Sequence, residues 1–200
     1  GGKGFYQADD GIPRHARLLA SDSRGRVWAA GQRGLAYFDG SRWHELTGQE
    51  DLPAGYVEGL AAGPGGSMWI AARDGLYRYA NAAQPVWTGA DGYAPGRIRD
   101  LLVESNGTAW VLGDSLVYQV GPEGRRVLGA QHGLPSDGLT AAELDPDGNV
   151  WIAGVAMGRG HRDGGVGRFD GTAWKVWRQQ DGLAETDVTA LFVDGAGRVW

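Results

Sequence analysis

The sequence lacks cysteine, long apolar runs and an excess of positive charge. Without cysteine, neither a disulfide framework nor a thiolate metal site can form. No stretch approaches the roughly 18 consecutive apolar residues of a membrane-spanning helix, so no membrane segment is expected in this chain. The net charge is −5 and the basic residues are scattered, which gives no positive surface to hold a phosphate backbone. We therefore expect no nucleic-acid partner, and nothing in the sequence calls for a cofactor.

Glycine and tryptophan, in contrast, are abundant and regularly spaced. The chain has 36 glycines and 9 tryptophans among 200 residues, a composition typical of short strands joined by tight turns. Four tryptophans recur every 41 residues and a fifth follows after 49: Trp28, Trp69, Trp110, Trp151 and Trp200. A glycine stands three residues before each, at Gly25, Gly66, Gly107, Gly148 and Gly197. A repeat of 41 residues therefore organises the chain.

Each repeat is predicted to contain four short strands. The first is a small-residue apolar segment, expected to be buried on both faces, at 16–22, 57–63, 98–104, 139–145 and 188–194. The turn D-x-x-G follows, in which glycine supplies a positive φ, and the second strand then carries the tryptophan. A Gly-Leu or similar pair opens the third strand. The pairs Asp39-Gly40 and Asp170-Gly171 predict two-residue hairpins that lead into a fourth strand.

Four antiparallel strands per repeat indicate an all-β fold, a β-propeller of tandem four-stranded antiparallel blades. A helical solenoid is disfavoured because stretches with a period of 3.6 residues are absent. The repeated tryptophans are expected to form the core between blades. About four and a half blades are present. We expect residues 1–200 to be a single propeller domain cut at both ends from a longer chain. The alternative is a small five-bladed ring.

The repeats also resemble a known family. Residues 132–154 (HGLPSDGLTAAELDPDGNVWIAG), 165–174 (GVGRFDGTAW) and 181–200 (DGLAETDVTALFVDGAGRVW) are similar to the two-component regulator propeller repeat. This resemblance implies a non-enzymatic ligand-sensing module of a periplasmic or extracellular receptor, often one that responds to glycans. It also implies signalling through the parent receptor, where dimerisation is an option. The third repeat lacks the Gly-Leu and Asp-Gly pairs, and we expect a specialised edge there.

Candidate ligand-binding residues lie in the loops that follow the second strands. We expect these loops to gather, with those that precede the first strands, at one end of the blades, whereas the repeated turns at the other end look structural. The eight extra residues of the fourth interval fall in the loop at 155–165. Arginine there suits a carboxylate or sulfate, and histidine donates or accepts near neutral pH. The alternative is a solvated loop without a partner. The candidates are Arg33, Arg73, Asp114, Arg159, His161, Arg162 and Asp163.

A second periodic set stands 19 residues before each repeated tryptophan: Asp9, Glu50, Asp91, His132 and Asp181. A ring of carboxylates there would bind a cation. The alternative, which we favour, is a turn residue that accepts backbone N–H bonds.

Enzymatic alternatives have weaker support in the sequence. No G-x-S-x-G nucleophile motif is present, and the four histidines lack metal-ligand spacing. Residues 165–170 (GVGRFD) are similar to the repeats of virginiamycin B lyase, but no His/Glu pair fits the metal site which that family requires. Ser21-Asp22 begins a turn similar to the Asp box of glycosidases, with an extra residue before its glycine. We therefore expect a binding module for a small molecule, a glycan or a protein. A propeller lyase and a protein-docking scaffold are the alternatives.

Overall fold

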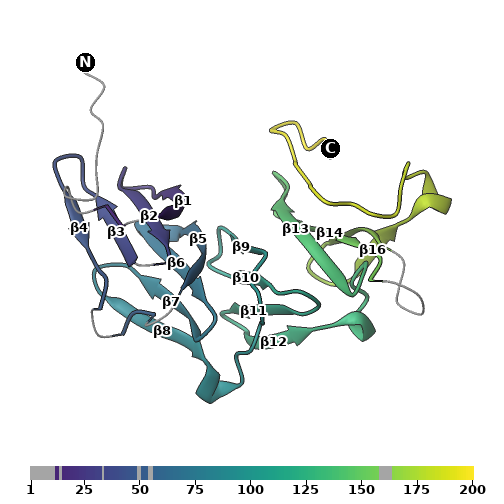
Figure 1. Ribbon diagram of the computed structural model, residues 1–200. Coiled ribbons are helices and arrows are strands. Elements are labelled where there is room, and N and C mark those ends of the chain that lie inside the picture. Colours follow the sequence, from purple (N-terminus) through teal and green to yellow (C-terminus); the bar gives the residue numbers. More distant parts are fainter. Residues whose placement is uncertain (1–11, 14, 33, 49–50, 54–55, 158–163) are drawn as a thin grey trace. The chain divides into compact units, whose positions relative to one another are not determined.

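The computed structural model describes residues 12–200 except 14, 33, 49–50, 54–55 and 158–163, and it contains four antiparallel sheets (Figure 1). The strands of each sheet pair in chain order, so each sheet is one predicted blade, and the all-β prediction is confirmed. The first two blades comprise β1 (Ala16–Ser21), β2 (Val27–Gly31), β3 (Gly34–Phe38), β4 (Trp43–Glu45), β5 (Val57–Gly63), β6 (Ser67–Ala72), β7 (Gly75–Tyr79) and β8 (Ala83–Thr88). The next two comprise β9 (Asp100–Val103), β10 (Ala109–Leu112), β11 (Val117–Gly121), β12 (Gly124–Leu128), β13 (Gly138–Leu144), β14 (Val150–Val155), β15 (Gly165–Phe169) and β16 (Trp174–Trp177).

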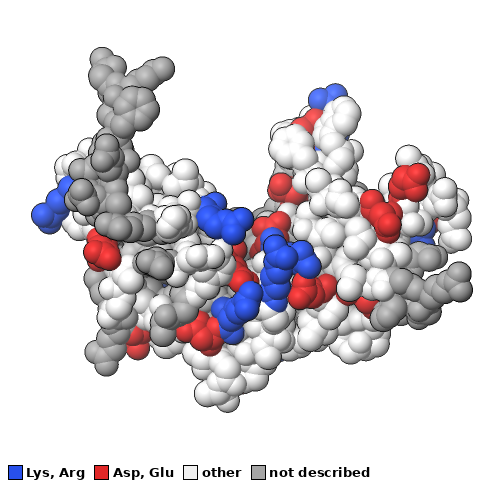
Figure 2. Space-filling model, viewed as in Figure 1, with Lys and Arg blue, Asp and Glu red and all other residues white. Residues whose placement is uncertain are grey.

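The chain forms two compact units, Gly1–Ala94 and Pro95–Trp200, each with its own hydrophobic core. In the first unit, the buried ring of Trp28 meets Tyr79 of the next blade edge-on, with centroids 5.2 Å apart. In the second unit, Trp110 meets Phe169 in the same way at 5.5 Å. The prediction that the repeated tryptophans pack between blades is confirmed at these two positions. On the face shown in Figure 2, basic side chains lie among acidic ones.

Burial differs between the first and second strands of a blade. All six residues of β6 are buried, as are all four of β10, and both strands lie inside their sheets. The prediction that the first strands are buried on both faces is wrong for β1, in which half-buried and exposed residues alternate. A first strand lies at the edge of its sheet, with a partner strand on one side.

The turns follow the predicted chemistry with one difference. The glycine of each D-x-x-G turn has a φ between 71° and 89°, as predicted. The hairpins predicted to have two-residue turns at Asp39-Gly40 and Asp170-Gly171 have four-residue turns instead, because each aspartate binds the two backbone N–H groups that follow its glycine. A two-residue connection occurs in the third blade, where Gly121 pairs with Gly124.

Candidate functional site

A carboxylate closes the turn between the first and second strands. One oxygen of Asp22 accepts the backbone N–H groups of Arg24 and Arg26, and the other accepts Nε of Arg26 at 2.6 Å and Nε1 of Trp28 at 2.9 Å. Burial alone would raise the pKa of Asp22, but the bonds from Trp28 and Arg26 hold it below its ordinary value. The same position accepts the indole N–H of its own repeat at Glu104, Asp145 and Asp194. A carboxylate six residues before the tryptophan therefore accepts the indole N–H in four of the five repeats.

The second repeat lacks this carboxylate. Gly63 occupies the position, and Nε1 of Trp69 is buried without a hydrogen-bond partner among the described residues. A β-carbon on Gly63 would lie 2.7 Å from the indole ring, so the ring itself has taken the space. The buried Nε of Arg78, in the neighbouring strand, has no partner there either.

This difference predicts unequal effects of replacing tryptophan by phenylalanine. Trp28→Phe removes the donor to Asp22, so we expect it to lower the free energy of unfolding by about 2 kcal/mol more than Trp69→Phe, which removes an unsatisfied N–H. Urea unfolding of the two variants, followed by circular dichroism, measures the difference. Equal losses would show that the indole bond does not contribute.

Two arginines fill the seam between the first and second blades. The guanidinium of Arg24 donates to the carbonyl of Gly65 at 3.1 Å and to Oδ1 of Asn81 at 3.0 Å, while Arg26 donates to the carbonyl of Gly66 at 2.8 Å. These acceptors lie on two turns of the second blade, one between its first and second strands and one between its third and fourth. We call the end of a blade where these turns lie the turn end, and the opposite end the loop end.

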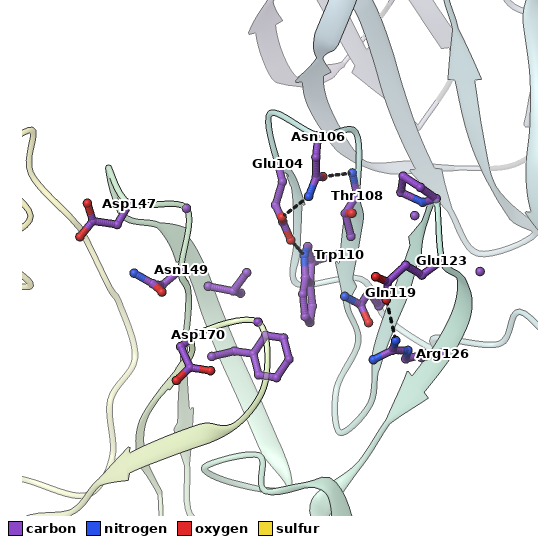
Figure 3. Close-up of a pocket in the computed structure, with 17 residues that line it drawn as sticks. Glu104, Asn106, Thr108, Trp110, Gln119, Glu123, Arg126, Asp147, Asn149 and Asp170 are labelled. Carbon is purple, nitrogen blue, oxygen red and sulfur yellow. Dashed lines mark hydrogen bonds and ion pairs between the residues drawn. The ribbon is translucent and has the colours of Figure 1, made fainter.

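In the second unit, the corresponding seam between the third and fourth blades contains a cavity of about 410 Å³ (Figure 3). Asn106 and Thr108 stand where the first repeat has Arg24 and Arg26, and their side chains are too short to cross. Asn106 instead folds back on its own turn, donating to Glu104 at 2.9 Å and accepting the N–H of Thr108 at 2.7 Å. The seam is therefore open where the first unit closes it.

The cavity lining is polar and mainly acidic. Its charged members are four carboxylates and one guanidinium: Glu104, Glu123, Asp147, Asp170 and Arg126. Arg126 is already paired with Glu123 at 3.0 Å. The backbone N–H of Ala173 and the hydroxyl of Thr172 lower the pKa of Asp170 to about 2, so this carboxylate is ionised at neutral pH. The rings of Trp110 and Phe169 supply an apolar wall. Such a lining suits a polar or cationic ligand.

At the loop end, two predicted site residues are engaged in ion pairs. Nε of Arg73 lies 2.9 Å from Glu58, and Asp114 lies 2.7 Å from Arg99. Glu58 and Arg99 occupy the same position of their repeats, eleven residues before the tryptophan, so the two pairs are equivalent with their charges reversed. A register shift beside Glu58 in β5 leaves this residue out of the strand pairing. Each candidate thus has a structural partner, and its binding role stays a prediction.

The other predicted site residues, Arg33, Arg159, His161, Arg162 and Asp163, lie outside the described residues. Within the described ranges, no group of three His, Asp or Glu side chains could hold a metal ion. No helix in that same part of the chain is long and apolar enough to cross a bilayer.

Two members of the periodic set before each tryptophan have the predicted role of a turn residue that accepts a backbone N–H. His132 accepts the backbone N–H of Gly129 at 2.9 Å, and Asp181 accepts that of Arg178 at 3.0 Å. Asp91 ends a short 3₁₀ turn, and Asp9 and Glu50 lie outside the described residues.

The cavity at the turn end was not predicted from the sequence, which indicated a structural role for that end. The available signal was the replacement of Arg-Gly-Arg at residues 24–26 by Asn-Gly-Thr at 106–108, in the repeat that also departs from the family pattern.

Comparisons with known proteins identify the fold. No protein-family model matches the sequence, and no curated protein matches it. The extracellular domain of BT3049 from B. thetaiotaomicron, assigned as a hybrid two-component system, superimposes with a TM-score of 0.70 at 17% identity, over 92% of this chain and 26% of that one. Virginiamycin B lyase from Staphylococcus aureus gives 0.67 at 13% identity, over 91% and 61%. YCF48 bound to D1 peptide gives 0.58 at 14% identity, over 90% and 58%.

At these identities the likeness shows the fold alone, and these similarities together confirm a β-propeller built of four-stranded blades. The chain spans about a quarter of the sensor ectodomain and about three fifths of the lyase. The structures it resembles thus include a sensor domain, an enzyme and a peptide-bound protein.

Proposed function

We propose that this chain is a non-enzymatic ligand-recognition module, part of the propeller of an extracytoplasmic sensor of the two-component regulator propeller type. The observation that carries the proposal is the open seam at the turn end of the second unit. It is a cavity of about 410 Å³, a size typical of small-molecule sites, lined by polar groups against two aromatic rings. The sequence resemblance to the two-component regulator propeller repeat supports a sensing role, and the fold is shared with a sensor ectodomain.

Thermal unfolding with a ligand panel tests the proposal. The panel contains neutral, acidic and basic saccharides, blocked amino-acid amides and divalent cations. A ligand that binds only the folded state adds about 2.7 kcal/mol of stability at 100 times its Kd, which raises the melting temperature measurably. We expect one class to stabilise the protein, and expect Asn106→Arg, which places an arginine in the seam as in the first unit, to remove the effect.

A second variant separates the two ends of the propeller. Arg159→Ala combined with Arg162→Ala removes two of the four arginines predicted for the loop end and changes no residue that lines the seam cavity. Loss of stabilisation in this variant, with Asn106→Arg unaffected, would place the site at the loop end. Chemical conversion of a stabilising ligand would overturn the non-enzymatic proposal in favour of a lyase.

A further inference from the structure

The seam of the first unit shows what chemistry the open seam can hold. In that seam, the side chain of Arg24 bonds to the second blade. Besides Gly65 and Asn81, one of its nitrogens also lies 3.4 Å from the carbonyl of Ala80. The exposed side chain lies so close to the turn of the second blade that a β-carbon on Gly66 would lie 2.4 Å from it. A guanidinium is therefore the group that this blade-to-blade geometry accommodates.

Every acceptor position of the first seam has a counterpart in the cavity wall. The paired residues Trp69 and Arg78 correspond to Trp151 and Arg168, which fixes the alignment of the two blades. On that alignment, the positions of Gly65, Gly66, Ala80 and Asn81 are held by Asp147, Gly148, Asp170 and Gly171. All four line the cavity.

Two of these replacements add negative charge. Asp147 stands where the first seam has Gly65, and Asp170 stands where it has Ala80. The side chain of Asp147 makes no hydrogen bond within the described part of the chain, where only its backbone N–H is bonded. The open seam thus keeps the backbone carbonyl positions of an arginine slot but loses the amide acceptor of Asn81, because Gly171 has no side chain. It gains two carboxylates, of which Asp170 already accepts the N–H groups of Thr172 and Ala173 within its own turn.

A hydroxyl side chain also lines this space. Thr108 is 7% exposed and lines the cavity, and its hydrogen bonds run through its backbone N–H and carbonyl. Its hydroxyl therefore has no protein partner in the described chain and is an acceptor for a ligand.

We infer that the cavity between the third and fourth blades binds the guanidinium group of an external ligand, which takes the place that Arg24 takes in the first unit. This inference rests on the proposed recognition function and names the class of its ligand. A planar guanidinium has five N–H donors and can reach carboxylates, carbonyls and the hydroxyl of Thr108 from one position. A small metal ion would need three or more ligands around a single point, and the described residues form no such group.

Calorimetric titration with N-acetyl-arginine amide and with its citrulline counterpart tests this inference. The two probes have nearly the same shape, but only the first is charged. We expect the arginine amide to bind at least about tenfold more tightly, which corresponds to about 1.4 kcal/mol. Methylguanidinium, titrated in parallel, separates a free guanidinium from an arginine side chain carried on a peptide backbone. Equal affinity of the arginine and citrulline probes, or no heat from any cationic probe, would overturn the inference.

Variants assign the binding to the seam. We expect Asn106→Arg to abolish binding of the arginine probe, and Asp147→Asn to weaken it by about two- to fivefold, as for one exposed ion pair. Glu185→Gln is the matched control, since it removes an exposed carboxylate of the same unit that is not part of the cavity, and it should leave the affinity unchanged. Should Asn106→Arg not fold, Asp147→Asn and Thr108→Val carry the test, because they change the side-chain volume little.

The result also separates this inference from the proposed function. A neutral or acidic saccharide that stabilises the wild type but not Asn106→Arg would support the seam as the binding site. It would overturn the inference that the ligand carries a guanidinium group. Arginine binding that survives Asn106→Arg would overturn the inference, because the charge would be bound elsewhere.

Discussion

Asp22→Ala is expected to destabilise the first unit by about 3 kcal/mol. The carboxylate accepts four N–H groups, and its side chain is fully buried in contact with Arg26. Removing it leaves the indole N–H of the fully buried Trp28 and the Nε–H of Arg26 without their acceptor. Arg26 keeps its bond to the carbonyl of Gly66 but loses its countercharge, and a charge without a partner ion is costly where it is largely buried. Urea unfolding followed by tryptophan fluorescence measures the loss.

The fifth repeat offers a matched control. Asp194 accepts the same set of donors, from the backbone of Ala196 and from Arg198 and Trp200, but Trp200 is 69% exposed. Asp194→Ala should therefore change the unfolding curve little. Similar losses from both variants would show that local turn geometry, rather than burial of the indole and guanidinium, gives the motif its stability.

The pH dependence of the Asp22 contribution follows from the direction of its pKa. The pKa of Asp22 is lower in the folded protein than its ordinary value of 3.8, against the opposing effect of burial. Its stabilisation is therefore complete above about pH 3.8 and is lost as the pH falls through the lowered pKa of the folded state. Between neutral pH and pH 5, the difference between wild type and Asp22→Ala should stay constant.

The fold was largely predictable from the sequence because its main signals are periodic. Each D-x-x-G-x-x-W unit specifies a turn, a positive φ and a strand, so the number and order of strands followed from the spacing. Burial of the first strands was overestimated, since a small-residue segment such as 16–21 does not reveal that it lies at a sheet edge. The hairpin at Asp39-Gly40 was predicted in the right place with the wrong length, because a side-chain acceptor competes with the tighter turn.

The candidate site was less predictable because the cavity arises where the side chain of Asn106 is too short to reach the next blade. Arg24 and Asn106 occupy the same position of the repeat, and only the structure shows that this position points across the seam to the next blade. Arg73 was likewise a candidate ligand residue because the sequence does not show which side chains lie beside it. The structure shows that it pairs with Glu58. Whether such a position is occupied by a side chain of the protein itself depends on the length of that side chain and on the strand register.

Gly113→Ala is expected to be among the most destabilising substitutions in the second unit. A β-carbon there would lie 2.5 Å from the carbonyl oxygen of Pro95 and 3.1 Å from that of Leu116. Both obstacles are backbone atoms, and the N–H of Gly113 is itself bonded to Leu116 at 2.8 Å, so neither can move without breaking the end of the blade. Overpacking of this kind costs about 3 kcal/mol at the upper end of its usual range.

Two comparisons make this expectation specific. Ala72 occupies the corresponding position of the second blade and is fully buried, so a methyl group is compatible with the strand itself. Gly195→Ala, in the same unit as Gly113, meets no atom within 4 Å and has no left-handed φ, so it should be neutral or slightly stabilising. The urea midpoints of the two variants are the measurement. If Gly113→Ala unfolds at the wild-type midpoint, the close approach of Pro95 is not a fixed feature of the third blade.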